Sequence, residues 1–335
     1  MAVKIGLILL AGLLLAGQQD PTPTPPPETF QSWLARAIAD ARGRGFDDRV
    51  IDRTLVGLEP LPRVVESDRS QAELIPLTLD RYLASRITAP MVRRGREMAR
   101  THDALLRRLE RTYGVPRQYL LAVWGVESRF GRLIGRTPVF QALATLAWEP
   151  RRSDFFRGQL FDAMRMVARG DIEASRMTGS WAGAMGQTQF LPSSYLEYAV
   201  DYDGDGRRDI WTSTPDTLAS IANYLKGYGW EAGEIWGREV RLSDAARASA
   251  LALPQRGTGC YAVRTMTARQ PLNAWRRLGV RRVDGTALPA SQVDAGLALV
   301  GNRAFLAYRN YDAILGYNCA HYYALSVALL ADRLR

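Results

Sequence analysis

A glutamate near the middle of the chain lies on the apolar stripe of a predicted helix that begins near Pro116. Burial without a cationic partner would raise the pKa of the Glu127 carboxylic acid toward neutrality, as a general acid requires. The alternatives are that Arg129 or Arg132 pairs with it, or that it is exposed at the helix end, and this segment alone leaves them open. Apolar side chains precede Glu127 at helical spacings of three, four and seven residues: Trp124, Val123 and Leu120.

A second segment, residues 180–195, has the composition of a neutral polar binding surface. Its sequence, SWAGAMGQTQFLPSSY, combines small residues with isolated amides and hydroxyls and contains no Asp or Glu. Small residues allow a ligand to approach the backbone closely, and amides and hydroxyls donate and accept uncharged hydrogen bonds. Such a surface suits a sugar that carries hydroxyl and N-acetyl groups.

A third segment resembles the calcium loop of an EF-hand. Gly206 falls at the sharp turn of the loop, and Arg207 would offer its backbone carbonyl oxygen. Position twelve is Thr212, where the standard loop has a bidentate Glu. The segment predicts a structural calcium site, and the alternative is a polar turn without an ion. Carboxylates occupy loop positions one, three, five and nine: Asp201, Asp203, Asp205 and Asp209.

Three motifs in this order resemble the membrane-bound lytic murein transglycosylase B family. They are GVESRFG at 125–131, SWAGAMGxxQFLPSSY at 180–195 and DYDGDG at 201–206, and the resemblance runs from about Phe30 to the C-terminus. It implies a mainly α fold, with a lysozyme-like helical core, an N-terminal helical domain and a small β-containing insert. It also implies an enzyme that cleaves the β-1,4 bond between N-acetylmuramic acid and N-acetylglucosamine without water.

The resemblance implies a role for each site residue. Glu127 would protonate the glycosidic oxygen and then deprotonate the muramoyl C6 hydroxyl, which gives a 1,6-anhydro product. Asp216 would complete the calcium site formed by Asp201, Asp203, Asp205 and the Arg207 carbonyl. Two rivals remain: a hydrolytic muramidase, and a non-catalytic peptidoglycan-binding or scaffold protein. The substrate-binding residues implied by the family are Ser180, Gln189, Tyr224, Tyr317, Asn318 and, in a diverged region, Tyr82.

The 335-residue chain is basic, with a net charge of +10, and arginine supplies almost all of its positive charges. A basic protein favours anionic partners, and the absence of any nucleic-acid-binding motif disfavours nucleic acid. We expect peptidoglycan glycan strands as the partner, a monomer, and possible contacts with cell-wall synthesis or division proteins. No cofactor is expected for catalysis, because the chain contains two histidines and no zinc or nucleotide motif.

The N-terminus reads as an export signal. An apolar run from Ile5 to Ala16 follows Lys4 and is too short to span a bilayer comfortably, so residues 1–17 are predicted to be a signal peptide. Gln18 stands where a lipidated cysteine would follow the signal. We therefore expect an exported, periplasmic protein without a lipid anchor, and retention by an uncleaved signal is the less favoured alternative. Residues 18–28 carry five prolines and read as a linker.

The remaining chain divides into three predicted parts. Residues 29–110 form an N-terminal helical domain, and residues 111–255 with 312–335 form the catalytic core, in which 201–216 is the EF-hand-like loop. Residues 256–311 form a small module, in which 261–267 and 305–309 are read as strands around a helix at 272–278. Cys260 and Cys319 could form a disulfide in an exported chain or remain free buried thiols.

Overall fold

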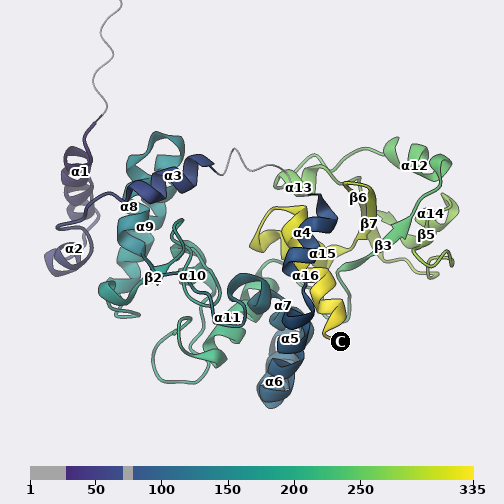
Figure 1. Ribbon diagram of the computed structural model, residues 1–335, viewed down its shortest axis with the longest axis horizontal. Helices are drawn as coiled ribbons and strands as arrows, with labels where there is room; N and C mark the ends of the chain where they lie inside the picture. The colour runs from purple at the N-terminus through teal and green to yellow at the C-terminus, as the bar shows by residue number, and fades with distance from the viewer. Residues whose placement is uncertain (1–27, 71–77) are drawn as a thin grey trace, which may run out of the picture.

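The computed structural model describes residues 28–70 and 78–335 and is mainly helical. Figure 1 shows the elements arranged along one long axis, with two groups of helices followed by a small sheet. Each of the three groups has its own cluster of buried apolar side chains. The predicted signal peptide and nearly all of the predicted linker lie outside the described residues.

The first group of helices surrounds the antiparallel pair α8 and α9. On α1, Trp33, Ala37 and Ala41 recur at helical spacing and are buried against α8, and Thr29 caps the first turn by accepting from the Ser32 amide. The group consists of α1 (Phe30–Gly43), α2 (Asp48–Thr54), α3 (Pro62–Ser70), β1 (Thr137–Pro138), α8 (Val139–Trp148), α9 (Ser153–Ala168), β2 (Thr178–Gly179) and α10 (Pro192–Tyr198).

The second group is built around α7, which is buried on nearly every face because α5, α6, α11 and α16 all pack against it. Pro116 is the N-cap of α7 and Gly114 ends α6 in the left-handed region, which separates the two helices as the sequence predicts. The group consists of α4 (Leu79–Arg86), α5 (Ala89–Thr101), α6 (Asp103–Tyr113), α7 (Arg117–Ser128), α11 (Thr214–Gly227), α15 (Arg309–Tyr317) and α16 (His321–Arg333).

The third group is an antiparallel sheet of strand order β4-β6-β7-β3-β5, packed against α12 and α14. Val240 of β3 is opposite Ala304 of β7, and Leu297 of β6 is opposite Leu306 of β7. The elements are β3 (Gly237–Arg241), α12 (Asp244–Leu251), α13 (Tyr261–Arg264), β4 (Gln270–Pro271), α14 (Leu272–Arg277), β5 (Arg281–Arg282), β6 (Asp294–Val300) and β7 (Arg303–Ala307).

The structure differs from the sequence prediction in this module. The sheet includes β3, so the module begins about twenty residues before the predicted start at 256. The predicted strand at 261–267 is wrong, because residues 261–264 form the short helix α13. A four-residue helix has no visible period, and the pattern of exposed Tyr261 and buried Ala262 imitates a strand. The predicted helix at 272–278 and the strand around Phe305 are present as α14 and β7.

The predicted N-terminal helical domain, residues 29–110, does not have a hydrophobic core of its own. Helices α1 to α3 contribute to the core of α8 and α9, whereas α4 to α6 contribute to the core of α7 and α16.

In residues 28–70 and 78–335, no single helix is long and apolar enough to cross a membrane. Helices α15 and α16 reach that length and composition only as a pair bent by 117°.

Candidate active site

Glu127 lies in the last turn of α7, on the face that carries the buried side chains of Leu120, Val123 and Trp124. The residue as a whole is partly exposed, whereas its carboxyl group is buried. Burial of its carboxyl group is the largest influence on its pKa, which rises from an ordinary value of 4.5 to about 7. Neither Arg129 nor Arg132 forms an ion pair with it, and within the described residues Glu127 has no ion-pair partner.

Two side chains from other helices moderate this pKa. The hydroxyl of Tyr323, on α16, donates a hydrogen bond of 2.5 Å to Oε1 of Glu127, and the positive charge of Arg86, on α4, lies close enough to act on it. Both favour the carboxylate and so lower the pKa, but burial outweighs them. The side chain therefore holds a proton near neutral pH and can release it, as a general acid and base must.

Aromatic rings extend from the glutamate across the junction of the first two helix groups. Tyr317 stacks on Tyr323 with ring centroids 6.3 Å apart, and Tyr224 lies 4.5 Å from Tyr317. The Tyr317 hydroxyl donates to the Thr188 carbonyl at 2.7 Å, and the Tyr224 hydroxyl donates to the Gly316 carbonyl at 2.9 Å. These bonds fix two of the sequence-predicted tyrosines between Glu127 and residues 180–195.

Residues 180–195 are held against α7 by Gln187. Its Oε1 accepts from the Trp124 indole at 2.9 Å, and its Nε2 donates to the Trp211 carbonyl at 3.0 Å. Gly131 is required at this contact, because a Cβ on it would lie 2.3 Å from Oε1 of Gln187, and its φ is +80°. These contacts hold the predicted sugar-binding segment against the helix of the acid.

Ser180 and Gln189 both support turns in this segment. The Ser180 hydroxyl oxygen accepts from the amides of Ala182 and Ala184 at 3.3 and 3.1 Å, which leaves its own hydrogen free to donate. Nε2 of Gln189 donates to the carbonyls of Ile134 and Gly186, and its backbone has a φ of +53°. Such a φ is uncommon outside glycine and costs of the order of 1 kcal/mol.

The last two predicted binding residues lie near the same site but make fewer contacts. The Tyr82 ring packs on Tyr322 at 5.3 Å, with the Arg86 guanidinium 5.3 Å from its centre. Asn318 is exposed at the C-terminal cap of α15, next to Cys319. Cys319 forms a disulfide with Cys260, with the two Cα atoms 6.1 Å apart, which resolves the alternative that the sequence left open.

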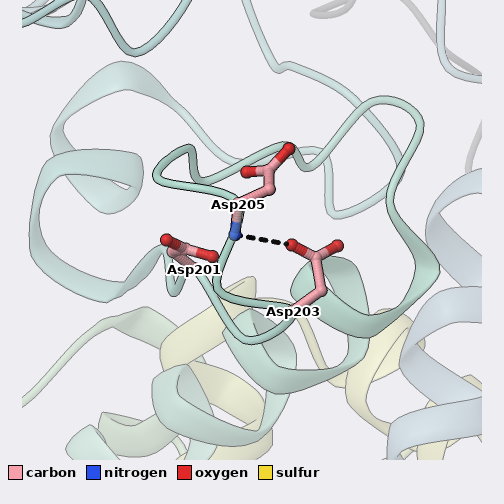
Figure 2. Close-up of side chains that lie close together, drawn as sticks. All are labelled: Asp201, Asp203 and Asp205. Carbon is pink, nitrogen blue, oxygen red and sulfur yellow. Dashed lines mark hydrogen bonds between the residues drawn. The ribbon is translucent and has the colours of Figure 1, made fainter.

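The calcium-like loop gathers three of its predicted carboxylates. Oxygens of Asp201, Asp203 and Asp205 lie within 4.8 Å of one another, and Figure 2 shows them on successive bends of the loop. Asp201 accepts from the amides of Gly204 and Gly206 at 2.8 and 2.9 Å. Hard oxygen ligands at this spacing match what Ca²⁺ prefers.

The remaining loop residues stabilise the backbone. Asp216 is buried and accepts from the amides of Tyr202, Asp203 and Asp209, which ties the loop to the first turn of α11. The Arg207 guanidinium donates to Asp205 at 3.0 Å. Asp209, at loop position nine, instead accepts from the amides that follow it: Trp211 and Thr212.

Sequence reasoning did not find Tyr323, Arg86 or Gln187, which contact or influence the acid or its helix. Tyr323 is 196 residues from Glu127 along the chain. A tyrosine pair at 322–323 is visible in the sequence, but only the fold shows which of the two faces the acid.

Comparison with known proteins gives the family. The transglycosylase SLT domain matches residues 29–332. Membrane-bound lytic murein transglycosylase B of Escherichia coli K12 is 33% identical over 254 residues, which are 74% of this chain and 64% of that protein. The match therefore spans less than two thirds of that relative's length.

Solved structures agree with this assignment. SltB3 from Pseudomonas aeruginosa, in complex with NAG-NAM-pentapeptide, has a TM-score of 0.83 and 41% identity, covering 92% of this chain and 80% of its own. The Escherichia coli lytic transglycosylase Slt35, in complex with calcium, has a TM-score of 0.72 and 29% identity, covering 90% and 92%. These matches confirm the predicted mainly α, lysozyme-like fold with a small sheet insert. The chain belongs to the transglycosylase SLT domain family, of the lytic murein transglycosylase B type.

Proposed function

We propose that the protein is a lytic murein transglycosylase that cleaves the bond between N-acetylmuramic acid and N-acetylglucosamine and leaves 1,6-anhydro ends. The observation that carries the proposal is the state of Glu127: it has no ion pair within the described residues, and its pKa is about 7. An acid with that pKa is partly protonated and partly ionised at neutral pH, so one residue can serve both proton transfers.

The reaction needs two steps and no water. Glu127 donates its proton to the glycosidic oxygen as the bond from that oxygen to C1 breaks, and the N-acetyl oxygen of the substrate stabilises the positive charge at C1. The Glu127 carboxylate then takes the proton of the muramoyl C6 hydroxyl while the oxygen of that hydroxyl bonds to C1. Held near C1, that hydroxyl has a large advantage over water, on the order of 10⁵ M in effective concentration.

The surrounding residues position the sugar in this account. The free hydrogen of the Ser180 hydroxyl and the remaining amide oxygen of Gln189 hold the N-acetyl and lactyl groups, by the contacts that their own turns leave unused. The aromatic and exposed polar residues shape the subsites on either side: Tyr224, Tyr317, Asn318 and Tyr82.

Digestion of isolated peptidoglycan tests the proposal. Glu127→Gln keeps the size of the side chain and removes its acid, so we expect release of soluble fragments to fall by at least about 10²-fold. Glu66→Gln, an exposed acid on α3, serves as the matched control and should retain wild-type activity. Retention of more than roughly a tenth of activity by Glu127→Gln would refute the role of the acid.

Two other functions would give different results. A hydrolytic muramidase would use the same acid, but it also needs a carboxylate to activate water, and residues 180–195 supply none. A non-catalytic binding or scaffold protein would bind glycan strands equally well as wild type and as Glu127→Gln, and would release no fragments from either.

We also propose that Asp201, Asp203, Asp205, the Arg207 carbonyl and Asp216 hold a structural Ca²⁺, and that Asp216 also fixes the loop through its bonds to three backbone amides. Support comes from the gathered oxygens of the three aspartates and from the calcium complex of the related Slt35. Calcium would neutralise clustered carboxylates at the end of the sugar-binding segment, and it has no part in the proton transfers.

Thermal unfolding tests this site. An ion that binds only the folded state raises the melting temperature, so the wild type should melt at a higher temperature with calcium than with chelator. Asp203→Asn with Asp205→Asn should abolish that difference, and Asp284→Asn, in an exposed turn of the small module, should preserve it. Identical melting curves of the wild type with calcium and with chelator would leave only a polar turn.

We further propose that the protein acts as a periplasmic monomer on glycan strands and is released from its signal without lipid attachment at Gln18. A relative of this chain is named as membrane-bound, which supports a cell-envelope location. Cell fractionation with N-terminal sequencing of the mature protein would test both parts, because a lipidated or uncleaved chain would remain in the membrane fraction.

A further inference from the structure

A cationic cavity of about 770 Å³ lies beside Glu127, between the end of α4, the start of α5 and the turn that follows α7. Val126, the neighbour of Glu127, forms part of its wall. Of the described residues that line it, none is an Asp or Glu, and four are arginines: Arg86, Arg94, Arg129 and Arg132.

The protein leaves most of this positive charge without an ion-pair partner. Within the described part of the chain, only Arg94 has an ion-pair partner, the exposed Glu97, and the Nε of Arg94 is buried without a hydrogen-bond partner. By contrast, Arg151 and Arg152 both pair with the buried Asp68. Four guanidinium groups on one cavity repel one another, so an anionic ligand there would gain favourable energy from each of them.

The backbone adds to the positive field and supplies an apolar floor. Thr88 and Pro90, at the N-terminus of the 13-residue helix α5, line the cavity, and a helix N-terminus favours anions. The turn after α7 has positive φ at Arg129 and Phe130, an uncommon conformation that places both residues in the lining. Met91, Phe130 and Leu133 provide the apolar surface.

We propose that this cavity binds the carboxylates of the peptide attached to N-acetylmuramic acid, so that the enzyme recognises peptide-bearing glycan. This inference rests on the proposed function, because the cavity adjoins the acid of that site. The sugars of peptidoglycan are uncharged and suit residues 180–195, whereas its negative charges are on the peptide, which also carries methyl groups for an apolar floor. The concave shape, formed from three separate segments, suits a peptide better than a flat membrane surface.

Calorimetry with the disaccharide N-acetylglucosaminyl-N-acetylmuramoyl pentapeptide tests the proposal on the full chain. This probe lacks the bond that the enzyme would cleave, so binding is measured without turnover. Arg94→Gln with Arg132→Gln should weaken binding by at least about tenfold, because two charge-assisted hydrogen bonds are lost. Binding of the disaccharide whose lactyl group ends in a simple amide instead of the peptide should be unchanged, and amidation of the peptide carboxylates should weaken wild-type binding to a similar degree.

Matched variants separate charge from folding. Arg94→Lys with Arg132→Lys should retain most of the peptide affinity, and Arg276→Gln with Arg277→Gln, two exposed arginines of α14, should retain all of it. If the double Gln variant does not fold, Arg132→Gln alone should show a smaller loss of the same kind.

Three results would overturn the proposal. The Gln pair could bind the peptide probe as tightly as the wild type does, or it could lose as much affinity for the disaccharide without peptide. It could also bind phosphatidylglycerol vesicles more weakly than the wild type while its affinity for the peptide probe is unchanged. The last would indicate a membrane surface instead. Failure of the proposed function would look different, since no anhydro product would form from glycan of either kind while peptide binding persisted.

Discussion

The phenol of Tyr323 donates a 2.5 Å hydrogen bond to Oε1 of Glu127, and these two residues belong to helices at opposite ends of the catalytic region of the sequence. The bond fixes the carboxyl group and stabilises its ionised form, while burial stabilises the protonated form. The balance keeps the pKa at about 7, where the group can both give and take a proton.

The first prediction concerns the pH dependence of kcat/KM. Because the folded pKa of Glu127 is raised from 4.5 to about 7, the acid is protonated below pH 7 and ionised above it. Activity should therefore be present below pH 7 and should fall by about tenfold per pH unit above it. Initial rates on soluble glycan strands from pH 5 to pH 9 would measure this.

Loss of structure must be separated from loss of the proton. The folded state retains the Glu127 proton up to about pH 7 and the unfolded chain releases it near 4.5, so this group's contribution to stability decreases as pH rises between those values. Circular dichroism at each pH serves as the control. A rate that stays level to pH 9 in a folded protein would contradict the assigned pKa.

Tyr323→Phe should move the falling limb of the pH profile, which is the decrease in activity above pH 7. Removing the hydroxyl removes a bond that favours the carboxylate, so the pKa of Glu127 should rise and the fall in activity should occur at higher pH. The neighbouring Tyr322→Phe, which keeps its ring contact with Tyr82, should leave the limb in place. An unshifted limb in Tyr323→Phe would mean that the bond does not tune the acid.

Asp216→Ala should destabilise the protein with or without calcium. The substitution leaves three backbone amides of the loop without their acceptor, which should cost roughly 2–4 kcal/mol. Asp205→Ala, at an exposed position of the same loop, should cost less than about 1 kcal/mol in the presence of chelator. Urea unfolding of both variants would measure the difference, and equal costs would contradict the buried role of Asp216.

Removing the disulfide should lower the free energy of unfolding. Cys260 and Cys319 are 59 residues apart, and closing a loop of that length is worth about 4 kcal/mol in the chain-entropy model. Cys260→Ser with Cys319→Ser should show this loss under oxidising conditions, and the wild type in reductant should match the variant. No loss would mean that the bond does not constrain the unfolded chain.

Much of the site was predictable because its signals are local. The helical spacing of Leu120, Val123 and Trp124 before Glu127 predicts the burial that raises the pKa, and Asp201, Asp203 and Asp205 alternate within one turn of chain. Helices α7, α9, α11 and α16 were predictable for the same reason, since each has an apolar face that repeats along many residues.

What could not be predicted depends on contacts between distant segments. Nothing near Glu127 identifies Tyr323 as its partner, and the apolar faces of α1 to α6 do not reveal that they divide between two cores. The strand β3 is five residues with a mixed pattern, and only its pairing with β7 and β5 defines it. The cationic cavity likewise exists only where α4, α5 and the turn after α7 meet.

Mass spectrometry of the fragments released from purified peptidoglycan tests the central claim most directly. Transfer to the substrate's own C6 hydroxyl and hydrolysis by water both need a protonated Glu127, so only the product distinguishes them. We expect fragments that are lighter than their hydrolysed counterparts by the mass of one water and that resist borohydride because they have no free aldehyde. Fragments that are predominantly hydrated and reducible would contradict the claim.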